Sequence, residues 1–183
     1  MADAWEPFRK LKIGWAIAKE PMDIPAYRRR IGHYFKRRGF QWEIADPRKR
    51  YDVVFVHHSA DLTTWQRYDR SKMILDYNDD YLSGVRRGIR DLGRGTAKYL
   101  VRQWAELELD YRQAYIKTMR RADAVVCCTV AQEELVGEYC SNIHIILDMQ
   151  CDEGWISKQQ YGAGKTYNLV WEGLPAFEGL RKF

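Results

Sequence analysis

The stretch that decides the fold is Val53-Val54-Phe55-Val56, an apolar run that ends abruptly in His57-His58-Ser59. Two later runs have the same form: Met73-Ile74-Leu75 leads into Asp76-Tyr77-Asn78-Asp79-Asp80, and Ala124-Val125-Val126-Cys127-Cys128 leads into Thr129. Short apolar runs without polar alternation indicate strands that are covered on both faces, as in a parallel sheet between helices. Because ligands of such sheets bind beyond the carboxyl ends of the strands, the polar residues after each run mark a candidate site.

Strands and helices are expected to alternate along the chain, which predicts an α/β fold with an open, mostly parallel Rossmann-like sheet and helices on both faces. The expected strands are 11–18, 40–45, 51–58, 72–76, 122–129 and 142–147. The expected helices are 25–38, 62–68, 96–121 and 131–139. The segment 83–95 holds four glycines and four arginines, and it is expected to be a loop or a broken helix.

Residues 1–150 are expected to form one Rossmann-like domain, followed by a polar, glycine-bearing linker at 151–166. Residues 167–183 have the pattern of a strand and the beginning of a helix, which is the opening of a second βα unit. The linker contains Gly162-Ala163-Gly164-Lys165-Thr166, but a P-loop needs glycine at position 159, which is Gln159. The turn after the first expected strand has no glycine, so the dinucleotide-binding fingerprint is missing as well.

The composition is that of a globular chain, with 183 residues, 46% hydrophobic residues and no apolar run of the roughly 18 residues that span a bilayer. The first seven residues have neither the basic nor the apolar region of a secretory signal. Four cysteines, with no CxxC pair, indicate small buried side chains in a reducing cytoplasm. They predict neither a metal site nor a disulfide. The four are Cys127, Cys128, Cys140 and Cys151.

Positive charge is concentrated at the start of the chain. Residues 1–50 hold thirteen Lys and Arg against six Asp and Glu, whereas residues 51–183 hold seventeen against nineteen. The clusters 28–30 and 36–38 lie on the outward arc of the first expected helix, and 48–50 follows later. They form either a solvated helix face or a patch that docks on anionic lipid, where each cation near the surface contributes about 1 kcal/mol. The membrane patch would comprise Arg28, Arg29, Arg30, Lys36, Arg37 and Arg38.

The carboxylates after the fourth expected strand are Asp76, Asp79 and Asp80. They could bind sugar hydroxyls, act as a base or hold a divalent ion, or they could serve only as turn and helix-cap residues. His57 and His58 would point to opposite faces if the strand continued, so at most one of them is expected in a shared crevice. Spacing alone assembles no nucleophile–base–acid triad.

Three motifs resemble the N-terminal domain of GT-B fold glycosyltransferases of the group 1, family 4-like type. Residues 121–153, which begin Arg-Ala-Asp-Ala-Val-Val-Cys-Cys-Thr, are similar to the stretch that closes that domain. Residues 72–82 are similar to its Asp-x-x-Asp-Asp segment, and residues 167–180 to the first strand and turn of the C-terminal domain. The resemblance covers residues 11–183, and the order of the three motifs is its strongest feature.

The resemblance implies that this chain is the acceptor-side half of an enzyme that transfers a sugar from a nucleotide-sugar to an acceptor hydroxyl. Residues 1–150 would hold the acceptor, and the donor would bind a second domain or partner chain, without which the chain is expected to be inactive. No metal or cofactor is expected besides the nucleotide-sugar substrate. The implied catalytic residues are Asp76, Asp79, His57 and His58, and the implied acceptor-binding residues are Lys19, Glu20, Asn78, Asp80 and Thr129.

The acceptor would be a glycan or a lipid-linked molecule, so the resemblance places the chain in the cytoplasm with peripheral contact to an anionic membrane. Two other functions compete with this interpretation. A non-catalytic flavodoxin-like or receiver-like binding module has the same fold pattern, although a receiver needs an Asp after strand three, where His57-His58 stand. A basic adaptor could bind a membrane or nucleic acid, but no RNA-binding motif or helix-turn-helix pattern supports nucleic acid.

Overall fold

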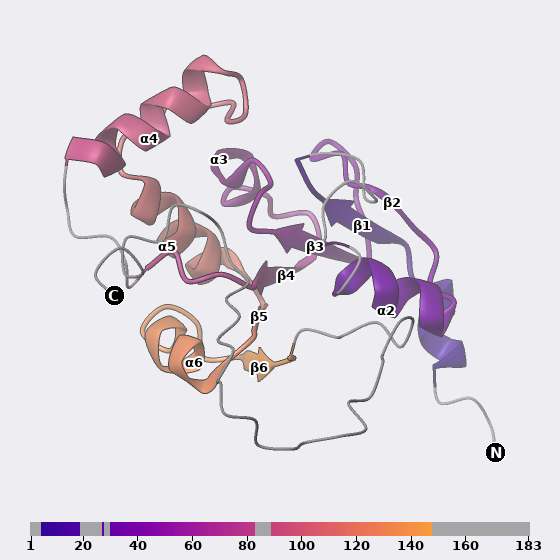
Figure 1. Ribbon diagram of the computed structural model, residues 1–183. Coiled ribbons are helices and arrows are strands. Elements are labelled where there is room, and N and C mark those ends of the chain that lie inside the picture. Colours follow the sequence, from indigo (N-terminus) through magenta and orange to yellow (C-terminus); the bar gives the residue numbers. More distant parts are fainter. Residues whose placement is uncertain (1–4, 19–26, 28–29, 83–88, 148–183) are drawn as a thin grey trace, which may run out of the picture. The chain divides into compact units, whose positions relative to one another are not determined.

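The structure is a computed structural model that describes residues 5–18, 27, 30–82 and 89–147 (Figure 1). The chain divides into two compact units, Met1–Gln150 and Cys151–Phe183, and all the described residues belong to the first. The predicted linker at 151–166 and the predicted second βα unit at 167–183 lie outside the described residues. So do Lys19, Glu20, Arg28 and Arg29.

The core of the first unit is a six-stranded sheet in which every pair of neighbouring strands is parallel. The strand order is β2-β1-β3-β4-β5-β6. After β2 is added on one side of β1, the later strands are added on the other side, so the topological switch point lies between β1 and β3. Ligands of open α/β sheets bind at such a point. This confirms the predicted α/β Rossmann-like sheet. The strands are β1 (Ile13–Ala16), β2 (Trp42–Ile44), β3 (Val53–His57), β4 (Lys72–Tyr77), β5 (Ala124–Cys127) and β6 (Ile143–Ile145).

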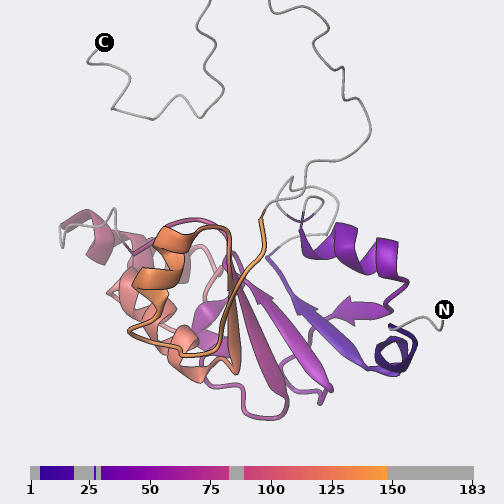
Figure 2. The same cartoon turned by 90° about the horizontal axis from the view of Figure 1, so that it is seen from below.

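Helices connect these strands and cover both faces of the sheet, as the sequence predicted. Their bounds are η1 (Glu6–Lys10, a 3-10 helix), α2 (Ile31–Arg38), α3 (Leu62–Trp65), α4 (Ile89–Leu100), α5 (Tyr111–Arg121) and α6 (Val130–Val136). Successive side chains of a strand point to opposite faces of the sheet, so the apolar core consists of two clusters, one on each face. Trp15 of β1 packs with Phe35 of α2 on one face, whereas Val54 of β3 shares the other face with residues of α3, α5 and α6. Figure 2 shows α2 and α6 on opposite sides of the sheet.

The predicted helix 96–121 is wrong, because the chain forms two helices, α4 and α5, joined by an irregular segment. After α4 the backbone of Arg102 turns left-handed, with φ 58°. The N–H of Gln103 donates to the carbonyl of Lys98, and the N–H of Arg102 donates to that of Tyr99, which is the Schellman pattern that ends helices. Asp110 then caps α5 by accepting from the N–H of Arg112.

Candidate functional site

The ends of β3, β4 and β5 bring the polar residues together, as the sequence predicted. His57 at the end of β3 pairs in register with Asp76 of β4, and Tyr77 of β4 pairs with Cys127 of β5. The carboxyl ends of parallel strands share one edge of the sheet, so the residues that follow, His58, Asn78–Asp80 and Cys128–Thr129, collect on that edge. This edge is the candidate site.

A buried ion pair between Arg30 and Asp76 lies at the centre of this edge. The Nε and Nη2 atoms of Arg30 donate to Oδ1 of Asp76 at 3.0 and 2.7 Å, and both side chains are almost fully buried. The remaining guanidinium nitrogen, Nη1, donates to Sγ of Cys128 at 2.8 Å and to the carbonyl of Ile146 at 3.0 Å. One arginine thus connects the start of α2 with β4, the β5–α6 turn and the segment after β6.

Arg30 therefore does not belong to an exposed membrane patch, and its place in the predicted patch is a correction. The sequence placed it with its neighbours on an outward helix face, but a carboxylate inside the protein draws the guanidinium inward. Lys36, Arg37 and Arg38, in the last turn of α2, are exposed as expected. The guanidinium of Arg38 lies 4.8 Å from the ring centre of Trp5.

His57 is held in a buried hydrogen-bond chain on the α2 side of the edge. The N–H of Ala18 donates to the hydroxyl of Tyr27, which lies 2.6 Å from Oγ of Ser59, and Oγ lies 2.9 Å from Nδ1 of His57. The N–H of Ser59 also donates to this Nδ1, which fixes Nδ1 as the acceptor. Burial, with smaller effects from His58 and Arg30, lowers the pKa of His57 to about 2. The imidazole is therefore neutral at any ordinary pH.

His58 follows the last residue of β3 and lies against different neighbours. Its ring centre is 5.0 Å from that of Tyr81, and its Nε2 lies 3.9 Å from Oδ2 of Asp79. Burial lowers the pKa of His58 to about 4, although the charge of Asp79 opposes this shift. The ring centres of His57 and His58 lie 3.9 Å apart, but the two rings contact different partners, so the expectation that at most one histidine faces a shared crevice stays a prediction. The strand ends at His57, and alternation between faces ends with it.

The other predicted residues of this edge have definite partners. The carboxylate of Asp79 is exposed and accepts from the hydroxyl of Tyr81 at 3.0 Å. Asp80 accepts from the N–H of Leu82, which is turn chemistry. The carbonyl of Asn78 accepts from the side chain of Gln132. Thr129 caps α6 in a reciprocal capping box with Gln132. Its hydroxyl is thus engaged with the backbone, and its predicted role in acceptor binding stays a prediction.

These contacts separate the four predicted catalytic residues into two pairs. Asp76 and His57 are about 1% exposed; Oδ1 of Asp76 is held by Arg30, and Nδ1 of His57 is held by Ser59. The side chains of Asp79 and His58 are 65% and 12% exposed, so a hydroxyl from solvent can reach them. A carboxylate beside a neutral imidazole can accept a proton. The catalytic roles of all four remain predictions, and the geometry favours Asp79 and His58.

Sequence reasoning missed four residues of this site: Arg30 as a buried partner, and Tyr27, Ser59 and Tyr81 as contacts of the histidines. Only Ser59 carried a signal, because it stands two residues after His57, within reach of a short turn. Nothing in the run Arg28-Arg29-Arg30 distinguishes the buried arginine from the others. Tyr27 also packs in the apolar core, with its ring centre 5.3 Å from that of Trp15.

Within the described residues, no group of three His, Cys, Asp or Glu side chains is arranged to hold a metal ion. Among the described residues, Cys127, Cys128 and Cys140 form no disulfide, and burial raises the pKa of Cys127 to about 11. Cys151 lies outside the described residues. None of the helices in the described ranges is long and apolar enough to cross a bilayer.

Comparisons of this chain with protein-family models, curated proteins and solved structures find no match. The fold and the geometry of the strand ends therefore carry the functional argument.

Proposed function

We propose that this chain is the acceptor-side half of a GT-B glycosyltransferase that transfers a sugar from a nucleotide-sugar to an acceptor hydroxyl. The observation that carries the proposal is the proximity of Asp79 and His58, whose Oδ2 and Nε2 atoms lie 3.9 Å apart, at the accessible end of two neighbouring parallel strands. The three motifs that resemble this family support it, because the first two flank β4 and β5 at this same edge.

In the proposed reaction, the acceptor hydroxyl lies against Asp79. The acceptor oxygen forms a bond to the anomeric carbon of the sugar, the bond from that carbon to the diphosphate breaks, and the hydroxyl proton passes to the carboxylate of Asp79. His58 stays uncharged at neutral pH because burial lowers its pKa to about 4.

The donor is a nucleotide-sugar, which we propose binds a second domain or a partner chain that faces this edge. No metal or other cofactor is part of the proposal. The acceptor is a glycan or a lipid-linked molecule, and the chain works in the cytoplasm with peripheral contact to a membrane. The basic residues Lys36–Arg38 support this contact.

A transfer assay tests the proposal. The chain is incubated with nucleotide-sugars and acceptor glycans, alone and together with a candidate donor-domain chain, and the product is detected by mass spectrometry. We expect Asp79→Asn to lower kcat by about 10²- to 10⁴-fold with the fold intact. Asp69→Asn, which changes an exposed carboxylate after α3, is the matched control and should retain full activity.

Two outcomes would contradict the proposal. Equal turnover of Asp79→Asn and the unchanged chain would remove the proposed base. Nucleotide binding without transfer, with every donor and acceptor and with the donor-domain chain present, would favour the non-catalytic binding module.

A further inference from the structure

The end of α4 and the segment that joins it to α5 expose several large apolar side chains. We call these residues the apolar turn. Gly95 brings the two limbs of this region together, since a Cβ at this position would lie 1.8 Å from the carbonyl oxygen of Glu108. A contiguous exposed apolar cluster on a protein surface marks a site of interaction. The apolar turn comprises Tyr99 (42% exposed), Leu100 (72%), Val101 (64%), Leu107 (53%) and Leu109 (52%).

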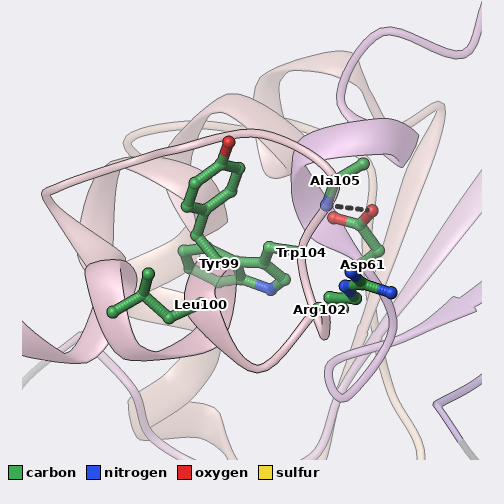
Figure 3. Close-up of a pocket in the computed structure, with 6 residues that line it drawn as sticks. All are labelled: Asp61, Tyr99, Leu100, Arg102, Trp104 and Ala105. Atoms are coloured by element: carbon green, nitrogen blue, oxygen red, sulfur yellow. Dashed lines mark hydrogen bonds between the residues drawn. The ribbon is translucent and has the colours of Figure 1, made fainter.

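A hollow of about 400 Å³ opens beside the apolar turn (Figure 3). Tyr99 and Leu100 lie on one side of it, Asp61 and Arg102 on the other, and Trp104 between them. The carboxylate of Asp61 is already engaged, because Oδ2 accepts from the N–H of Ala105 at 2.9 Å and Oδ1 caps α3. The guanidinium of Arg102 is exposed and adds a positive charge to the lining of the hollow.

Arg102 occupies a backbone position that favours glycine. It is the left-handed residue of the Schellman pattern after α4, with φ 58°. Residues with side chains are destabilised in this conformation, and such strain is typical of functional sites. The sequence therefore places a cation beside the hollow at a cost in stability.

Two more cations, both in α4, precede Arg102 in the sequence at four-residue intervals. Arg94 lies 4.9 Å from the ring centre of Tyr111, and Lys98 lies 5.1 Å from the same ring. In the described part of the chain, neither these two nor Arg102 forms an ion pair with a carboxylate.

The acidic residues of the same segment have partners elsewhere. Glu106 pairs with Arg67, and Glu108 pairs with Lys117 at 2.5 Å. The surface thus combines the apolar turn with cations that form no ion pair in the described part of the chain. Such a combination of apolar and cationic groups binds an anionic bilayer.

We propose that the apolar turn docks on an anionic membrane surface, with Leu100 and Val101 entering the lipid and the exposed Arg94 and Arg102 facing the headgroup phosphates. This inference rests on the proposed peripheral membrane association and adds to the basic end of α2 a second surface, which supplies the apolar contacts.

Co-sedimentation with vesicles tests the inference. The vesicles contain equal amounts of phosphatidylcholine and phosphatidylglycerol, and a second set contains phosphatidylcholine alone. The double variant Leu100→Ser, Val101→Ser should bind the anionic vesicles at least about tenfold more weakly, because both exposed apolar side chains are lost. Arg102→Gly should weaken binding roughly fivefold, and only with anionic vesicles.

Two control variants separate this surface from others. Val130→Ser removes an apolar side chain of α6 with similar exposure, 61%, and should leave binding unchanged. A variant with glutamine at Lys36, Arg37 and Arg38 removes the basic end of α2. Circular dichroism confirms that each variant is folded.

Each remaining outcome overturns the inference. If binding is lost only in the α2 variant, membrane association stands but occurs through α2. If the unchanged chain binds neither set of vesicles, the proposed membrane association is wrong. The transfer assay tests the transferase proposal independently. If Leu100→Ser, Val101→Ser converts a dimer into a monomer by light scattering without changing vesicle binding, a second copy of this chain covers the apolar turn.

Discussion

Removing one partner of the Arg30–Asp76 ion pair should destabilise the fold severely. Asp76 Oδ1 accepts two guanidinium hydrogen bonds, and Arg30 and Asp76 are 5% and 1% exposed. Loss of one partner of a buried pair costs about 3–5 kcal/mol, because the other charge stays buried. This is a large share of the roughly 5–15 kcal/mol that stabilises a domain. Asp76→Asn and Arg30→Leu should each lower the midpoint temperature by roughly 10 °C.

The assay is urea unfolding followed by far-UV circular dichroism, with the free energy of unfolding obtained by linear extrapolation. The double variant Arg30→Leu, Asp76→Asn should cost about 2 kcal/mol less than the sum of the two single variants, because no charge is then left alone. Lys72→Met breaks the exposed pair with Asp123, in which Lys72 is 76% exposed. This control should change stability by less than about 1 kcal/mol.

Three results would refute the reasoning about this pair. A cost below about 1 kcal/mol for each single variant would mean that the pair behaves as an exposed one. Strict additivity in the double variant would mean that the two groups do not interact. A strong decrease of the Asp76→Asn effect in high salt would mean that solvent ions screen the pair, which burial prevents.

Further predictions concern pH and the helix α4. Burial keeps the pKa of His57 at about 2 and that of His58 at about 4, below the ordinary 6.5, so the unfolded chain gains protons first as the pH falls below 6.5. The free energy of unfolding should therefore fall by about 4 kcal/mol between pH 7 and pH 5, and His58→Gln should reduce that slope; a flat profile would contradict the burial. Gly93→Ala, where a Cβ has nothing within 4 Å, should stabilise α4 by up to about 1 kcal/mol. Gly95→Ala, which meets backbone, should destabilise it by about 1–3 kcal/mol, and equal effects at the two glycines would show that the close approach is absent. Arg102→Gly should raise the free energy of unfolding by about 1 kcal/mol and Arg102→Ala should not, as calorimetry can show.

The sequence was sufficient to predict the sheet, because buried parallel strands are short and uniformly apolar. Val53–His57 and Ala124–Cys127 are strands within a residue or two of their predicted ends. The break between α4 and α5 could not be predicted, since apolar residues continue at helical spacing through it. Leu100 and Leu107 match the helical pattern but are exposed, and the left-handed turn falls on an arginine and not on a glycine.

The candidate site was predictable in its location but not in its contacts. His57 and Asp76 lie in register because β3 and β4 are neighbouring parallel strands that end at the same edge of the sheet. Which arginine would turn inward depends on long-range packing between α2, β4 and the segment after β6. The pairing of His58 with Asp79 depends on where β3 ends, to the exact residue, and residue patterns do not define strand ends that closely.

Chemical-shift mapping of the ¹⁵N-labelled chain during titration with acceptor glycans tests the central claim most directly, since it needs neither donor nor partner. The account predicts saturable shifts that centre on His58 and Asn78–Tyr81, and their loss in Asp79→Asn. Shifts confined to α2 or α6, or no shift with any glycan, would contradict the assignment of this edge as an acceptor site.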